Sequence, residues 1–365
     1  MTWSWTLYRY LALQFLIAVA IIYAGFLLLG LSIDLVDLTN HRTATGEAVP
    51  TGALIGMAIL KLPSLGQKLM PFAILIGGVF CFVRLSRTQE LVATRAAGVS
   101  AWDFLTPPLA VAVLIGLAAV ILVTPISARM LGEFSALEAK YIRGEASQLA
   151  VSNNGLWLRQ GDENKQSVIH ALRVSNQGVR LDGVIVFLYG PNDRFEGRID
   201  ARSAELHPGA WLLHGAWASG PEGRPVQHDT YSLPTTLTPE RIQESFASPD
   251  TLSFWDLPGF IGSAQAAGFS AIRYQLYFYN LLALPALFAA MVFMAASFSL
   301  RLARFGGLAR VVLYSVFAGF GVYFFSNITQ TLGQSGILPV SLAATAPAAA
   351  AILIGMTLVF HQEDG

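Results

Sequence analysis

Residues 10–31 read YLALQFLIAVAIIYAGFLLLGL, an apolar run without a charged side chain. A bilayer core about 30 Å thick is crossed by about 20 apolar residues in helical form, so this run is long enough to span a membrane. It is also longer than the apolar segment of a signal peptide, which has about 7–15 residues. We therefore predict an uncleaved first transmembrane helix, although Ala18-Val19-Ala20 faintly resembles a cleavage site.

The same criterion predicts six transmembrane helices in all, at about 9–33, 53–83, 102–124, 274–300, 308–332 and 338–360. The second is interrupted by Lys61, Pro63, Lys68 and Pro71, and we predict that it is kinked rather than absent. The composition agrees with a membrane protein, because 54% of the residues are hydrophobic and only 13% are charged. Soluble domains carry about 25% charged residues.

The short connections differ in charge, and this difference predicts the orientation. Arginines gather after the second and fourth helices: Arg84, Arg87 and Arg95, then Arg301, Arg304 and Arg310. Positively charged loops stay on the cytoplasmic side, whereas the segment after the first helix carries Asp34, Asp37 and Glu47 with only Arg42. We therefore predict that both termini are cytoplasmic and that residues 125–272 lie outside.

The outer segment predicts a small β domain. Short alternating runs separated by turn residues are typical of a sandwich or jelly roll; they cover 155–159, 167–174, 184–189, 198–206, 211–217 and 230–237. Residues 126–150 are interpreted as a helical extension of the third transmembrane helix. Residues 251–272 are interpreted as an amphipathic segment that places Phe254, Trp255, Leu257 and Phe260 at the membrane interface.

These elements divide the chain into residues 1–125, with transmembrane helices 1–3, residues 126–250, with the β-jellyroll domain and its helical lead-in, and residues 251–365, with the interfacial segment and helices 4–6. The fold class is thus an α-helical integral membrane protein with an inserted β domain. Zero net charge gives no indication of nucleic-acid binding. No phosphate-binding loop or catalytic motif occurs, and we predict no metal site and no cofactor bound by this chain.

Residues 86–100 form a short amphipathic pattern between the second and third helices. Gly98 is a natural helix C-cap, so we predict a helix over about 87–97 that lies on the cytoplasmic face. Such a helix can dock in a groove of a partner protein. The alternative, a plain interfacial loop whose arginines only set the orientation, remains open.

Polar residues inside the predicted spans have two interpretations. Lys61 and Lys68 share a helix face and either face a cavity and an anionic ligand or extend to the lipid headgroups. A second group either makes hydrogen bonds between helices or lines a transport path; it comprises Asn280, Asn327, Thr329, Gln330 and Thr331.

Several short motifs resemble, in order, a known family. They are Leu7-Tyr8-Arg9-Tyr10, the Leu62–Pro71 stretch, Glu90-Leu91-Val92 with Ala97-Gly98, Gly155-Leu156-Trp157, Arg273-Tyr274-Gln275-Leu276, Ala309-Arg310-Val311-Val312, and Gly319-Phe320 with Tyr323. With the helix–β–helix layout, they resemble the LptF/LptG permeases of the lipopolysaccharide export ABC transporter over nearly the whole chain. The chain looks closer to the LptG type.

The resemblance implies an inner-membrane permease that pairs with a second, LptF-like permease on a dimeric cytoplasmic LptB-like ATPase, which uses ATP and Mg. It also implies an LptC-like single-pass protein, a periplasmic LptA-like bridge, and lipopolysaccharide handed to the β-jellyroll domain. The implied ATPase-coupling residues are Arg87, Glu90, Leu91, Thr94, Arg95, Ala97 and Gly98.

The candidate lipid-binding residues are Lys61, Lys68, Asp34, Asp37, Phe26, Tyr323 and Phe324. Related chains carry lysine near the outer end of helix 1, where this chain has Asp34 and Asp37, so phosphate contacts do not transfer directly. A membrane-embedded enzyme acting on lipid or peptide and a non-transporting scaffold are the alternative functions.

Overall fold

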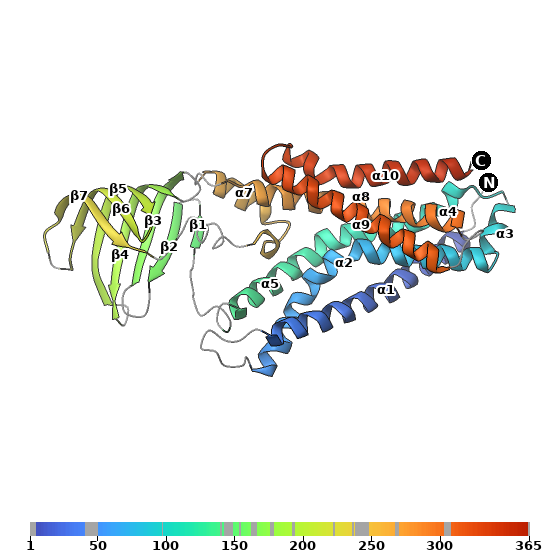
Figure 1. Cartoon of the computed structure of the whole chain (residues 1–365), viewed down its shortest axis with the longest axis horizontal. Helices are drawn as coiled ribbons and strands as arrows, with labels where there is room; N and C mark the ends of the chain where they lie inside the picture. Colours follow the sequence, from blue (N-terminus) through green and yellow to red (C-terminus); the bar gives the residue numbers. More distant parts are fainter. Residues whose placement is uncertain are drawn as a thin grey trace. The chain divides into compact units, whose positions relative to one another are not determined.

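The computed structural model describes residues 5–40, 50–96, 98–138, 141, 149–152, 155–161, 166–175, 179–191, 194–221, 223–235, 237, 248–266, 270–302 and 308–363. The chain divides into two compact units (Figure 1). The helical unit comprises Met1–Arg143, Asp250–Phe254 and Gln275–Gly365. The β unit comprises Gly144–Pro249 and Trp255–Tyr274.

Six helical spans among the described residues are long and apolar enough to cross a membrane, which confirms the predicted fold class. They are α1 (Trp5–Asn40), α2 (Thr51–Arg87), the continuous span α4–η1–α5 (Ala101–Ala118, Ala119–Val123, Thr124–Glu138), α8 (Ile272–Leu302), α9 (Leu308–Gln334) and α10 (Val340–Glu363). The 37 residues of α2 run through Pro63 and Pro71 without a break. At 1.5 Å per residue, α2 is about 55 Å long, well beyond a bilayer core of about 30 Å.

The main core of the helical unit lies between α1, α2, α4, α8 and α10, where Phe15, Phe82 and Phe288 are fully buried. Glycines allow the closest approaches between these helices. A Cβ atom on Gly77 of α2 would lie 2.7 Å from the Cα of Val19 on α1. Lipid offers no hydrophobic driving force between helices, so such close packing supplies much of the association energy.

The third span contains one wide turn, the π-helical segment η1. The backbone N–H of Thr124 donates to the carbonyl oxygen of Ala119, five residues earlier. The side-chain amide of Gln67 on α2 donates to Thr124 Oγ1 at 3.3 Å, so the wide turn is bound to its neighbour. Before the turn, Gly116 packs against Pro285 of α8; after it, α5 packs against α2.

The β unit contains one antiparallel sheet of seven described strands in sequential order. They are β1 (Leu149–Ser152), β2 (Gly155–Gly161), β3 (Gln166–Ser175), β4 (Arg180–Gly190), β5 (Arg194–His207), β6 (Ala210–Ser219) and β7 (Val226–Pro234). The predicted β domain is present, but each described strand pairs with its neighbour in the sequence. A jelly roll with Greek-key connections orders its strands differently, so the connectivity is that of a meander.

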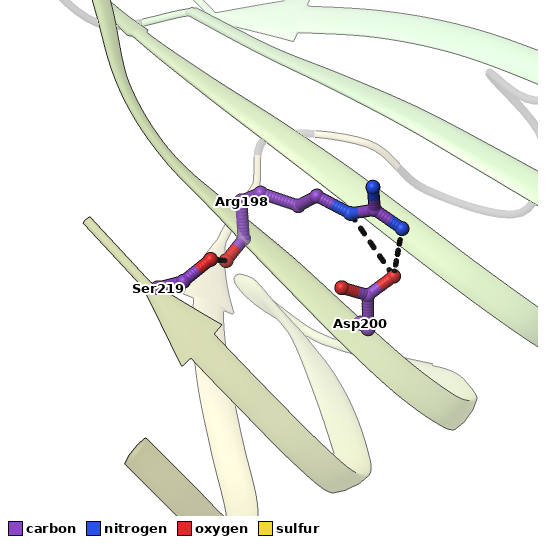
Figure 2. Close-up of polar contacts among 3 residues, drawn as sticks. All are labelled: Arg198, Asp200 and Ser219. Atoms are coloured by element: carbon purple, nitrogen blue, oxygen red, sulfur yellow. Dashed lines mark hydrogen bonds and ion pairs between the residues drawn. The ribbon is translucent and has the colours of Figure 1, made fainter. Parts of the chain in front are cut away.

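The two faces of the sheet differ in polarity. Alternate residues point into an apolar core in which Trp211 and Leu213 are fully buried. Figure 2 shows the opposite face, where both Arg198 Nε and NH2 donate to Asp200 Oδ1, at 3.1 and 2.5 Å. Ser219 Oγ on β6 donates to the Arg198 carbonyl oxygen at 3.2 Å. The apolar face of the sheet is therefore buried, and the polar face is exposed.

Two local predictions need correction. The helical extension predicted over 126–150 runs too far, because β1 begins at Leu149; α5 is described to Glu138, and Tyr141 is helical as well. Of the four side chains assigned to the membrane interface, only Trp255 is exposed, at 62%. Leu257 is buried at the start of α7 (Leu257–Ala266), Phe260 packs on Tyr274 with ring centroids 4.6 Å apart, and Phe254 stacks on Phe278.

Gly183 in β4 has a φ of +66°, a conformation that L side chains rarely adopt. We expect Gly183→Ala to destabilise the adjoining strands by about 1–2 kcal/mol. Hydrogen exchange of the β3 and β4 amides in the full chain should accelerate accordingly, whereas the control Gly220→Ala, whose Cβ meets no atom within 4 Å, should not change it. Unchanged exchange in both variants would contradict the strain argument.

Candidate coupling helix and lipid-contacting surface

A short separate helix connects the second and third spans. Helix α3 covers Glu90–Ala96 and is set off from α2 by Gln89, whose φ of 61° turns the chain. Gly98, with a φ of 82°, ends the segment, and Ser100 then caps α4 by accepting a hydrogen bond from the Asp103 N–H at 3.2 Å. The predicted helix is thus present but shorter than 87–97, and Arg87 belongs to the end of α2.

The candidate coupling residues have distinct surroundings. Leu91 is buried, and Thr94 Oγ1 donates to the Glu90 carbonyl oxygen at 2.6 Å. Arg87 and Gly98 are exposed. Ala97 and the side chain of Arg95 lie outside the described part of the chain.

Glu90 is tied to the first helix. Tyr10 Oη of α1 donates to Glu90 Oε2 at 2.9 Å, and Arg84 NH1 of α2 donates to Gln14 Oε1 at 3.1 Å. These two bonds connect the start of α1 to both sides of the α2–α3 turn. Sequence analysis missed Tyr10 and Gln14 as partners, because nothing in a linear pattern pairs residues 80 positions apart.

The start of α4 and the end of α10 lie at the same end of the helical unit as α3. The rings of Trp102 and Phe360 lie 4.4 Å apart. In Figure 1, α3 lies at the end of the helical unit where α1 begins and α10 ends. This end of the helical unit therefore brings together α3 and the ends of the first, second, third and last spans.

Lys61 forms an ion pair with Asp34, which joins α1 to α2. Asp34 is only 6% exposed and lies beside the apolar cluster of Leu38, Leu54, Met57, Ala58, Leu131 and Phe134. The Lys61 ammonium also lies 5.5 Å from the centroid of the Phe134 ring. Lys61 therefore has an anionic and an aromatic partner within the chain.

Lys68 has a different environment. Its side chain is 69% exposed, and its ammonium lies 3.7 Å from Asp250 Oδ2 in the 3₁₀ turn η5 (Pro249–Thr251). Although seven residues separate the two lysines on one helix, they meet different neighbours. Asp37 is exposed on α1, and Phe26 is half-buried on the same helix.

Two exposed aromatic residues of α9 contact the helix that carries Lys68. Tyr323 and Phe324 are 53% and 66% exposed. Phe72, one turn after Lys68, contacts the rings of Phe320 and Tyr323 with centroids 5.9 and 6.0 Å apart. We call Lys68, Phe72, Phe320 and Tyr323 the α2–α9 surface, in which the Phe72 ring lies between the exposed Lys68 one turn earlier on α2 and the two exposed rings of α9.

The other polar residues of α9 bond within their own helix. Thr329 Oγ1 donates to the Ser326 carbonyl oxygen, Thr331 Oγ1 to the Asn327 carbonyl oxygen, and the Gln330 amide to Ser326 Oγ. These bonds satisfy the polar groups locally, so they give no support to a polar path along α9. No group of three metal-ligating side chains gathers in the parts of the chain that the structure describes.

These features define a multi-pass membrane protein with an inserted antiparallel β domain and a short helix between two spans. Residues 9–360 match the family described as lipopolysaccharide export system permease LptF/LptG, and the chain belongs to this family. It is similar to the permease protein LptG of Escherichia coli (strain K12), with 24% identity over 349 residues, covering 92% of this chain and 93% of the relative. LptG of Haemophilus influenzae is 23% identical over 325 residues, with 84% and 85% covered.

The predicted resemblance, including its LptG type, is therefore confirmed. The family and the six spans make the chain a multi-pass inner-membrane protein and a transport permease rather than a classical enzyme.

Proposed function

We propose that the chain is one of two permease subunits of an ATP-driven exporter that extracts lipopolysaccharide from the inner membrane. The observation that carries this proposal is α3, a separate helix between two spans in a chain of the LptF/LptG family. A cytoplasmic ATPase dimer, LptB-like, uses ATP and Mg and docks on α3. This chain itself binds no cofactor.

The orientation follows from charge. The last turn of α2 carries Arg84 and Arg87, and α3 lies next to it, so this end faces the cytoplasm with both termini. The β unit then lies in the periplasm, where it hands the lipid to an LptA-like bridge. An LptC-like single-pass protein accompanies the complex.

The second permease, LptF-like, packs against the helices of this chain whose apolar side chains are exposed. In α1 only 6% of the most apolar stretch is buried, and in α9 17%, against 61% in α8. Exposed apolar side chains on both helices include Leu28, Leu29, Ile33, Phe317, Phe320 and Phe324. A helix of the partner and the acyl chains of the cargo would supply apolar surfaces for these side chains. An acyl chain that leaves the bilayer without meeting such a surface costs about 0.8 kcal/mol per exposed CH₂.

The test is Glu90→Lys, which reverses the charge at the first residue of α3. We expect the amount of ATPase that co-purifies with the chain to fall by about tenfold or more, because a misplaced like charge at an interface costs several kcal/mol. Glu133→Lys, the same reversal at an exposed acid on α5, should leave co-purification unchanged.

Two further variants separate docking from folding. Tyr10→Phe removes only the bond to α1, and Glu90→Gln keeps an acceptor for Tyr10 but removes the charge. If the charge docks the ATPase, Glu90→Gln weakens association and Tyr10→Phe does not. Full ATPase binding by Glu90→Lys would refute the assignment of α3.

A further inference from the structure

Helix α3 does not determine its own orientation. It covers only Glu90–Ala96, and isolated helices shorter than about 12 residues are marginally stable in water. The turn before it holds Gln89 at a φ of 61°, a backbone conformation that residues other than glycine seldom adopt and that persists only where surrounding contacts impose it. The direction of α3 relative to α2 therefore depends on contacts with a third element.

Helix α1 bonds to both sides of this turn. Before the turn, Arg84 NH1 donates to Gln14 Oε1 at 3.1 Å. After it, Tyr10 Oη donates to Glu90 Oε2 at 2.9 Å. Tyr10 and Gln14 are four residues apart and so lie on one face of α1. Without the second bond, α3 could pivot at Gln89 while α1 and α2 stayed in place.

Beyond the turn, α1 and α2 form one packed pair. A Cβ on Gly77 would lie 2.7 Å from the Cα of Val19, and Asp34 of α1 pairs with Lys61 of α2. Protein interiors packed this closely transmit displacement, because they have little free volume to absorb it. An α3 that is held to the start of α1 therefore moves the pair, whereas an α3 that pivots at Gln89 moves only itself.

The Glu90 carboxylate can serve α1 and a partner protein at the same time. A carboxylate accepts hydrogen bonds at two oxygens, and among the described residues only Tyr10 donates to this one, at Oε2. Glu90 is also partly exposed. Oε1 is therefore available to a cation of the proposed ATPase while Tyr10 keeps its bond.

We propose that Tyr10 is a positioning residue, which acts through Glu90 to prevent α3 from pivoting at Gln89, so that displacement of α3 by the ATPase moves α1 and α2. The inference rests on the proposed function, because it names the residue that links the docked helix to the transmembrane helices. Tyr10 does not itself dock the ATPase, so docking and transmission can be separated at this one hydroxyl group.

The first test uses the full complex in liposomes that contain lipopolysaccharide. We expect Tyr10→Phe to leave ATPase co-purification, the KM for ATP and the ATP turnover unchanged, and to lower the lipid extracted per ATP hydrolysed about tenfold, as for loss of one hydrogen bond to a charged group. The control Tyr314→Phe, at a tyrosine of α9 that is 50% exposed, should change none of these quantities. A purely stabilising role would instead reduce the yield of complex and leave the ratio of lipid to ATP unchanged.

A second test measures the pivot without reference to the cargo. Spin labels at Leu13→Cys on α1 and Ala96→Cys on α3 would occupy exposed positions, and the one cysteine of the sequence, Cys81, is buried. We expect a narrow distribution of distances between the labels in the otherwise unmodified complex. With Tyr10→Phe the distribution should become about twice as wide, because α3 then populates more than one orientation.

Three results would overturn the proposal. An unchanged ratio of lipid to ATP in Tyr10→Phe would mean that α3 drives the helices without this bond. Loss of the ATPase from that variant would make Tyr10 part of the docking surface, and an unchanged distance distribution would show that other contacts orient α3. If the unmodified complex contains no ATPase or extracts no lipid, the proposed function itself fails, and this inference with it.

Discussion

Lys61→Met is expected to lower the free energy of unfolding of the chain by about 3–5 kcal/mol, the typical effect of breaking a buried ion pair. The methionine fills a similar volume, so the loss comes from Asp34, which remains buried between α1 and α2 with neither oxygen compensated. Titration of the detergent-purified chain with SDS, followed by helical circular dichroism, measures the change.

A second variant shows whether charge or packing is responsible. Asp34→Leu/Lys61→Met replaces both charges by apolar groups and is expected to be about as stable as the unmodified chain, because apolar replacements of buried pairs are often neutral. Lys68→Met, at an exposed pair, should cost no more than about 1 kcal/mol. If the paired replacement is as unstable as Lys61→Met, the ion pair is not what stabilises this contact.

Gly77→Ala is expected to cost about 2–3 kcal/mol, the upper part of the range for overpacking. Its Cβ atom would lie 2.7 Å from the Cα and 2.9 Å from the backbone nitrogen of Val19, and backbone atoms cannot rotate away. Helices α1 and α2 would have to separate, and this is the most extensive helix–helix contact of the helical unit. The same SDS titration is the measurement.

The matched control lies on the same helix. A Cβ on Gly56 would meet no atom within 4 Å, so Gly56→Ala should be neutral or stabilise α2 by up to about 1 kcal/mol through helix propensity. Equal midpoints for Gly77→Ala and Gly56→Ala would contradict the close approach of α1 and α2 at Val19.

The sequence predicted the spans well because each is decided by its own composition. A run such as 10–31 must cross the membrane whatever its neighbours are, and α2 tolerates Pro63 and Pro71 because adjacent helices surround it. The strands β2 to β7 were predicted for a similar reason, since alternation of polarity is local. Strand β1 has four residues and was too short to give that signal.

Contacts between elements could not be predicted in the same way. The pairing of Asp34 with Lys61 depends on the register of α1 against α2, which no periodicity determines. Amphipathicity identified the segment 251–272 but not the neighbours of its apolar side chains, of which Leu257 is fully buried in the protein. Alternation of polarity likewise predicts the number of strands but not how they are connected, so it could not distinguish a meander from a jelly roll.

The wide turn at Ala119–Val123 has a consequence for comparing this chain with its relatives. A five-residue hydrogen-bonded turn holds one residue more than a regular α-helical turn, and every later side chain is rotated by about 100° relative to an uninterrupted helix. A helical wheel that treats 101–138 as one regular helix therefore assigns the residues after the wide turn to the wrong face. A relative with a regular helix here would align only with a one-residue gap inside a membrane span, where no loop exists to absorb it.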